Sequence, residues 1–132
     1  DLRLPANFFD LIISNNALEH TENPLKELRN LYQALKPGGK ICIVVPLDNK
    51  IYSYKPNDIN YHLFSWSPMN LGNILNCAGF KVLKSEPFIH KWMPNYNLFV
   101  RLFGWKLFHL TCRLYGRIDR SWYQIRGIAI KE

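Results

Sequence analysis

Blocks of apolar residues in the first third of the chain predict a strand, a helix and a second strand, in that order. The apolar run at residues 9–14 has no polar alternation, which is typical of a strand in a parallel sheet that is buried on both faces. After Asn23-Pro24, a capping residue and a proline suited to the first helical position, leucines recur at helical spacing as far as Leu35. Residues 37–39 (PGG) end this helix, and residues 41–45 form a second buried strand.

Two strands joined through one helix predict a parallel, right-handed βαβ unit. In sheets of this kind, ligands bind at the carboxyl ends of the strands. We therefore expect functional residues between Asn15 and His20, which follow the first strand, and after Pro46, which ends the second.

The remaining pattern adds a long loop, a helix and two further strands. Residues 47–64 are rich in Asn, Asp, Tyr and Pro without a sustained period, which predicts a long loop that its aromatic residues keep ordered. Ser67 and Pro68 begin a helix that Gly79 ends, and a strand starts at residues 80–83. Alternation at residues 122–131 predicts the last strand.

A further helix, predicted over residues 98–117, has an unusual surface. A stripe at four-residue intervals is mostly basic, and aromatic and aliphatic residues fill most other positions; the stripe consists of Arg101, Trp105, His109, Arg113 and Arg117. Gly104 weakens this helix. The charges are too frequent for a membrane span. Three interpretations stay open, in order of preference: packing on the sheet or on a partner chain, contact with a membrane interface, and RNA binding without a recognisable motif.

The net charge of +7 belongs to the same part of the chain. Residues 1–80 contain seven basic and seven acidic residues, whereas residues 81–132 contain ten basic and three acidic residues. A basic partner surface is therefore expected in the C-terminal part, and no nucleic acid is favoured as its partner.

Composition is that of a globular domain. The 132 residues are 48% hydrophobic and 14% aromatic, which is enough for one domain with a modest core. Cys42, Cys77 and Cys112 are odd in number and widely spaced, so neither a zinc site nor a disulfide framework is predicted, and a cytoplasmic location fits best. The first residues lack the pattern of a signal peptide and an initial Met, so we expect that the chain starts in mid-domain.

Three consecutive segments, FDLIISNNALEH, NPLKELRNLYQALKPGG and KICIVVP, closely resemble one part of a known fold. They resemble the fourth strand, the following helix and the fifth strand of class I S-adenosylmethionine-dependent methyltransferases, in the broad group that includes quinone-biosynthesis enzymes (methyltransferase type 11). The resemblance implies an α/β, Rossmann-like sheet with helices on its faces, of which residues 1–132 form the C-terminal half of a single domain. It also implies strand order 4-5-7-6, with the last strand antiparallel. The chain departs from the family in a helical insertion at about residues 88–121 before the last strand, where family members commonly have a short hairpin.

S-adenosyl-L-methionine is the cofactor that the resemblance implies. The family's Gly-rich cofactor turn would precede this chain, and no such turn exists in it. Asp1 resembles the family's acidic residue near the adenine, while Asn15, Asn16 and Ala17 lie where the family binds the cofactor. In the alternative interpretation, the two asparagines only satisfy backbone groups of a turn.

Candidate residues for the chemistry are His20 and His62. An imidazole titrates near neutrality and can remove a proton from a substrate hydroxyl during methyl transfer. Glu19, Tyr61 and His62 are expected to contact the acceptor. Each histidine has a structural alternative, as a loop residue or as a ring packed under a lid. We expect no metal, because Asn16 stands where a further carboxylate ligand would help.

The function predicted from these residues is methyl transfer to a small-molecule or lipid-linked acceptor, with O-methylation as the default because of the two histidines. Activity is expected to be incomplete in this fragment. The alternative is a non-enzymatic binding module that keeps the half-fold without catalysis. Peripheral contact of residues 98–117 with the inner face of the membrane and self-association of the chain are also expected.

Overall fold

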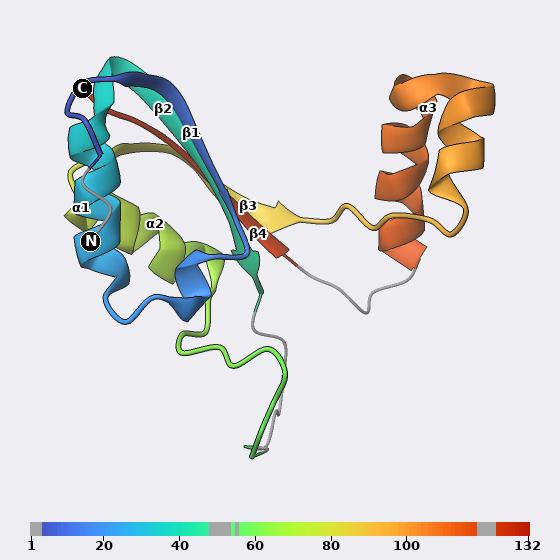
Figure 1. Cartoon of the computed structure of the whole chain (residues 1–132), viewed down its shortest axis with the longest axis horizontal. Coiled ribbons are helices and arrows are strands. Elements are labelled where there is room, and N and C mark those ends of the chain that lie inside the picture. Colours follow the sequence, from blue (N-terminus) through green and yellow to red (C-terminus); the bar gives the residue numbers. More distant parts are fainter. Residues whose placement is uncertain (1–3, 48–53, 55, 119–123) are drawn as a thin grey trace.

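A computed structural model describes residues 4–47, 54, 56–118 and 124–132. Its elements follow the chain in the order β1 (Phe9–Asn15), a short 3₁₀ turn η1 (Leu18–His20), α1 (Pro24–Ala34), β2 (Leu35–Pro46), α2 (Pro68–Cys77), β3 (Lys81–Phe88), α3 (Tyr96–Ile118) and β4 (Gln124–Ile130) (Figure 1). The α/β class predicted from the sequence is confirmed.

Four strands form one mixed sheet in the order β1-β2-β4-β3. β1 runs parallel to β2, and β4 lies antiparallel between β2 and β3. Cys42 of β2 is thereby aligned with Ile13 of β1 and with Ile128 of β4. This is the arrangement that the sequence predicted for its four strands, including the antiparallel last strand.

The hydrophobic core lies on the face of the sheet that α1 and α2 cover (Figure 1). Alternate residues of the two central strands point into it and are almost fully buried against Leu28 of α1 and against Leu71 and Leu75 of α2; these strand residues are Ile41, Ile43, Val45, Ile125 and Ala129. Gly127 permits this approach, because a Cβ atom there would come within 2.9 Å of Leu75 Cδ1. Burial of these side chains is the main favourable term that holds the helices on the sheet.

On the face of the sheet opposite α1 and α2, the expected burial of β1 is wrong. Residues 9–14 were predicted to be buried on both faces, yet Leu11 and Ile13 are 54% and 68% exposed. A right-handed crossover from β1 to β2 places α1 on one face, and α2 lies on the same face. The side chains of β1 that point the other way are therefore left open to solvent.

Local signals set the start of both helices as predicted. The Asn23 side chain accepts a hydrogen bond from the Lys26 backbone N–H at 3.0 Å, and Pro24 follows at the first helical position. Ser67 and Asn70 form a reciprocal capping box at the start of α2.

The exit from α1 differs from the prediction. The helix ends at Ala34 and β2 already begins at Leu35, so Lys36 lies beyond the helix and pairs with Asp10 at 2.8 Å. Gly38, with φ of +78°, sits in a bulge of the strand, where the pairing of β1 with β2 shifts between Phe9 and Leu11. The predicted Gly turn is therefore part of β2.

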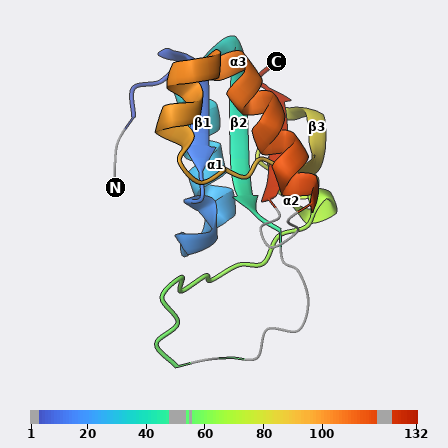
Figure 2. The ribbon, with the colours of Figure 1, turned by 90° about the vertical axis from the view of Figure 1, so that its right-hand side faces the viewer.

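The predicted helix 98–117 is a hairpin of two helical segments. Gly104 has φ of +75° and ψ of 169°, which no helix accommodates, so the chain reverses direction there (Figure 2). After the break, Phe108, Cys112 and Gly116 follow one another at four-residue spacing and are buried. They pack on the segment that leads out of β3: Trp92 meets Phe108 edge-on, and the Lys91 N–H donates to the Cys112 carbonyl at 3.2 Å.

Among the described residues, no helix is long and apolar enough to cross a membrane.

We predict that the 132-residue chain self-associates through β1. One edge of β1 pairs with β2, and no described strand pairs with the other edge, which lies beside exposed Leu11 and Ile13. Unpaired edges of this kind recruit further strands, and a lysine there blocks pairing. Ile13→Lys should shift the chain toward monomer in light scattering across a concentration series. The matched change on the other edge strand, Leu83→Lys, should leave association unchanged, and a monodisperse monomer of the unmodified chain would contradict the prediction.

Candidate functional site

The carboxyl ends of β1 and β2 lie together, as the βαβ unit requires. Asn15 ends β1, and Asn16 then adopts a left-handed conformation with φ of +49°. The Asn16 N–H donates to the Val44 carbonyl of β2 at 2.9 Å, which holds the start of the loop against the neighbouring strand. Asn15, Asn16 and Ala17 are all exposed at this edge. Asp1, the other predicted cofactor residue, lies outside the described residues.

Glu19 is the most unusual residue of this edge. It lies in η1, is fully buried, and neither of its carboxylate oxygens has a hydrogen-bond partner among the described residues. A buried carboxylate without a donor is unfavourable, so such a group is normally satisfied by a neighbouring side chain, a water molecule or a ligand. The closest cationic candidate is His20, whose Nε2 lies 3.9 Å from Glu19 Oε1 and whose side chain remains 44% exposed.

Residues 62 and 63, in the segment that follows β2, lie next to Glu19 and His20. The Leu63 N–H donates to the Glu19 carbonyl at 2.9 Å, and the His62 ring lies 5.1 Å from the His20 ring, centroid to centroid. Glu19, His20 and His62 each offer one ligand atom, and these atoms lie within 4.8 Å of one another. Tyr61 precedes His62 with its side chain exposed, and its N–H donates to the Asp58 carboxylate at 3.2 Å. Two loops far apart in the sequence thus place a carboxylate and two imidazoles together.

This cluster can carry out two kinds of chemistry. An imidazole placed beside a bound hydroxyl can take up its proton, as histidine does in general base catalysis. The same three groups suit a divalent transition metal, which favours imidazole and carboxylate ligands. Asn16, which stands where a further carboxylate ligand would help, accepts a hydrogen bond from Gln124 at 3.3 Å through its amide oxygen. The expectation that no metal is needed stays a prediction.

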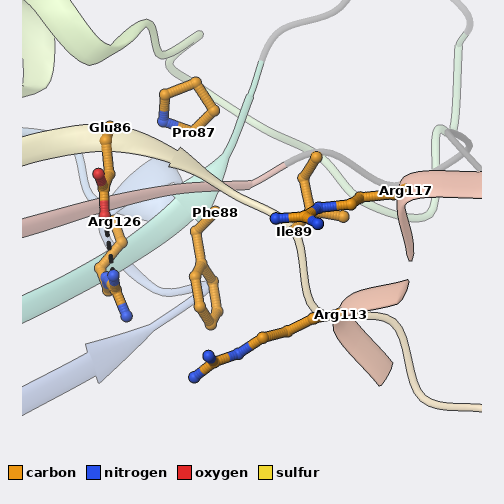
Figure 3. A pocket seen from close by; sticks show the side chains of 7 residues that line it. All are labelled: Glu86, Pro87, Phe88, Ile89, Arg113, Arg117 and Arg126. Carbon is orange, nitrogen blue, oxygen red and sulfur yellow. Dashed lines mark hydrogen bonds and ion pairs between the residues drawn. The ribbon is translucent and has the colours of Figure 1, made fainter. Parts of the chain in front are cut away.

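A concave site lies between the sheet and α3, formed by residues that no motif singles out. Its volume is about 260 Å³, and it is lined by Glu86, Phe88 and Arg126 from the strands and by Arg113 and Arg117 from α3 (Figure 3). The basic excess of residues 81–132 is the sequence signal that pointed to this region. The convergence of three arginines was not predictable, because it depends on how the α3 hairpin folds back.

Comparison with known proteins places these sites in context. A family model described as a methyltransferase domain matches residues 1–85. Over 47 residues the chain is 34% identical to the chloroplastic 2-methyl-6-phytyl-1,4-hydroquinone methyltransferase of Arabidopsis thaliana, a match that covers 36% of this chain and 14% of that enzyme.

Solved structures agree on the fold at low sequence identity. The [4+2]-cyclase SpnF has a TM-score of 0.61 and 18% identity, with 99% of this chain and 53% of that chain covered. An S-adenosylmethionine-dependent methyltransferase from Archaeoglobus fulgidus has a TM-score of 0.59 and 21% identity, with 97% and 62% covered. The 1,6-didemethyltoxoflavin-N1-methyltransferase of Burkholderia thailandensis, solved with S-adenosylhomocysteine, has a TM-score of 0.59 and 16% identity, with 96% and 45% covered.

The chain therefore spans about half the length of these solved structures. S-adenosylmethionine is supported as the family's cofactor, in agreement with the prediction. Because the family model covers residues 1–85, well over half of the chain, this protein belongs to the methyltransferase domain family, with the Rossmann-like fold of class I S-adenosylmethionine-dependent methyltransferases.

Proposed function

We propose that this chain is the acceptor-side part of an S-adenosylmethionine-dependent methyltransferase that methylates a hydroxyl oxygen. The observation that supports this best is the cluster of Glu19, His20 and His62 at the carboxyl ends of β1 and β2. Sheets of this kind bind ligands at that edge. A proton acceptor there is what an alcohol or phenol needs when it becomes a nucleophile.

The exposed residues Asn15, Asn16 and Ala17 fit the margin of a cofactor site. They follow β1 directly, and the left-handed turn at Asn16 leaves the Asn15 side chain and the small Ala17 at the open edge of the sheet. Together with Asp1, they would contact the bound cofactor. When bound, S-adenosylmethionine supplies an electrophilic methyl group on a sulfonium.

The roles of the other residues follow from their positions. His20, whose side chain is accessible, accepts the proton of the acceptor hydroxyl. The buried Glu19 carboxylate stabilises the imidazolium that forms, and His62 lies close enough to share in binding the acceptor oxygen. Tyr61, which precedes His62 in the chain, contributes an exposed aromatic ring. Most of the rate enhancement then comes from positioning and water exclusion, because a displacement needs few catalytic groups.

We predict that the 132-residue chain alone binds S-adenosylmethionine weakly or not at all and transfers no methyl group. A chain that spans about half the length of these solved structures is expected to lack part of the surface that would bind the cofactor. Titration calorimetry with S-adenosylmethionine measures this directly. Tight binding by the chain alone would show that its cofactor site is complete. An absence of binding even when the chain is joined to a cofactor-binding half would favour a non-enzymatic module.

We predict that His20→Ala lowers the maximal rate of the complete enzyme by about a hundredfold or more, with little change in cofactor affinity, as expected for a general base. His62→Ala should act mainly on the Michaelis constant of the acceptor. His109→Ala is the matched control, since His109 pairs with His90 at 3.1 Å away from the cluster. Unchanged turnover of His20→Ala would leave it a structural role, and loss of activity on treatment with a chelator would point to a metal instead.

The surface of α3 supports a lipid-linked acceptor. Several of its apolar side chains are about half exposed or more, among them Leu102, Phe103, Trp105, Leu110 and Leu114. Packing on the sheet or on a partner chain was the preferred interpretation for this helix. Its buried side faces residues 89–93 and not the sheet, and packing on a partner chain stays an alternative to membrane contact. Exposed aromatic and aliphatic residues interspersed with Arg and Lys are typical of helices that lie in a membrane interface.

We predict that the protein binds anionic vesicles through α3, at the inner face of the membrane. Each basic residue near an anionic surface contributes on the order of 1 kcal/mol, so binding should need anionic lipid and weaken with salt. Leu110→Gln with Leu114→Gln should reduce co-sedimentation, whereas the matched change of exposed Leu83 on β3 should not. Protein that stays in the supernatant with anionic vesicles at low salt would rule out this contact.

A further inference from the structure

The cavity between β3, β4 and α3 concentrates positive charge around one aromatic ring. Figure 3 shows Arg113 reaching from α3 beneath the Phe88 ring, and Arg117 lying beside Ile89. The Arg126 guanidinium stacks on the same Phe88 ring, 4.7 Å from its centroid. Three guanidinium groups from two elements thus face one volume of about 260 Å³, opposed by the single carboxylate of Glu86.

The hydrogen bonds of Arg126 leave capacity for a ligand. Its Nη2 donates to Glu86 at 2.8 Å, but its Nε is buried without a partner among the described residues. Glu86 is shared with Lys84, also at 2.8 Å, and both partners hold the pKa of this carboxyl below its usual range, so it stays ionised and fixes Arg126 in place. A buried guanidinium N–H without a hydrogen-bond partner is normally satisfied by an acceptor, and an oxyanion is the acceptor that suits a basic cavity best.

The two arginines of α3 carry uncompensated charge. Within the described part of the chain, no carboxylate pairs with Arg113 or Arg117. Burial and the neighbouring His109 lower the pKa of His90, and Arg113 lowers it further. Arg113 and Arg117 are one turn apart, so both guanidinium groups can point at one ligand.

The size of the cavity and the residues around it indicate which class of ligand it can bind. A volume of about 260 Å³ is below the ~300–1,000 Å³ typical of sites for whole drug-sized molecules, so the cavity suits a compact charged group. Phosphate oxygens match the fork geometry of arginine. Leu110 lies one turn before Arg113, and Leu114 one turn before Arg117, and both leucines are about half exposed. An apolar surface therefore borders the basic cavity on α3.

We propose that Arg113, Arg117 and Arg126 bind the phosphate group of a lipid whose apolar chain lies along Leu110 and Leu114. This inference deepens the proposed membrane contact of α3 and rests on it only for the apolar part of the ligand. The site is distinct from the cluster of Glu19, His20 and His62, and it would hold a phosphorylated lipid by its head group at the junction of the sheet and α3.

Calorimetry with soluble ligands tests the site apart from both methyl transfer and bilayer binding. The 132-residue chain should bind dihexanoyl phosphatidic acid below its micelle concentration, and inorganic phosphate more weakly. The double variant Arg113→Gln, Arg117→Gln should lose about tenfold or more in affinity, the equivalent of one or two charge-assisted hydrogen bonds.

Arg101→Gln with Lys106→Gln provides the matched control. This variant also removes two positive charges from α3, but at positions that do not line the cavity. Its affinity should change by less than about threefold, as expected for screened surface charge. Equal losses in the two double variants would overturn the site in favour of diffuse attraction. Inorganic phosphate binding as tightly as the short-chain lipid would overturn the lipid assignment. A chain that fails to bind vesicles but binds dihexanoyl phosphatidic acid in this way would keep the phosphate site and lose only the bilayer contact.

Discussion

The pairing of β2 on both of its edges is the interaction on which the rest of the structure depends. β2 is held by β1 on one side and by β4 on the other, so Ile41, Ile43 and Val45 present a continuous apolar row to α1 and α2. A register shift of one residue would turn this row to the opposite face and expose it. The same pairing places the carboxyl end of β1 beside the carboxyl end of β2. The polar residues that follow these two ends lie at the edge of the sheet where ligands bind.

The cluster at this edge depends on one backbone hydrogen bond between two loops. The Leu63 N–H on the Glu19 carbonyl fixes the segment after β2 against η1, and the ring of His62 reaches His20 as a result. An apolar residue would suit the core better than Glu19, because its buried carboxylate has no hydrogen-bond donor within the described part of the chain. A residue that is unfavourable for stability at the ligand edge of a sheet is a reasonable marker of function.

Local signals made most of the sheet and the start of both core helices predictable. Proline and capping residues at Asn23 and Ser67 act within one turn, and the apolar run at residues 41–45 predicts a buried strand, as observed. The exposed side of Leu11 and Ile13 was not predictable, since an apolar run indicates what a strand is suited to and not what lies beside it.

Gly104 was recognised only as a weak point of a helix, because whether a glycine bends or reverses the chain is decided by tertiary contacts, here those of Phe108, Cys112 and Gly116 with residues 89–93. His20 and His62 were candidates from the sequence, but their proximity depends on a long-range loop contact.

The pairing of Phe88 with Gln124 has a consequence for how this fold can change. These residues are the last pair of the β3–β4 ladder, so the whole α3 hairpin leaves and re-enters the sheet at neighbouring positions. Closing a loop between adjacent strand ends costs little more free energy when the loop is long than when it is short. The hairpin is therefore an exchangeable module: evolution or an engineer can replace it with another length or chemistry without disturbing the register of the sheet.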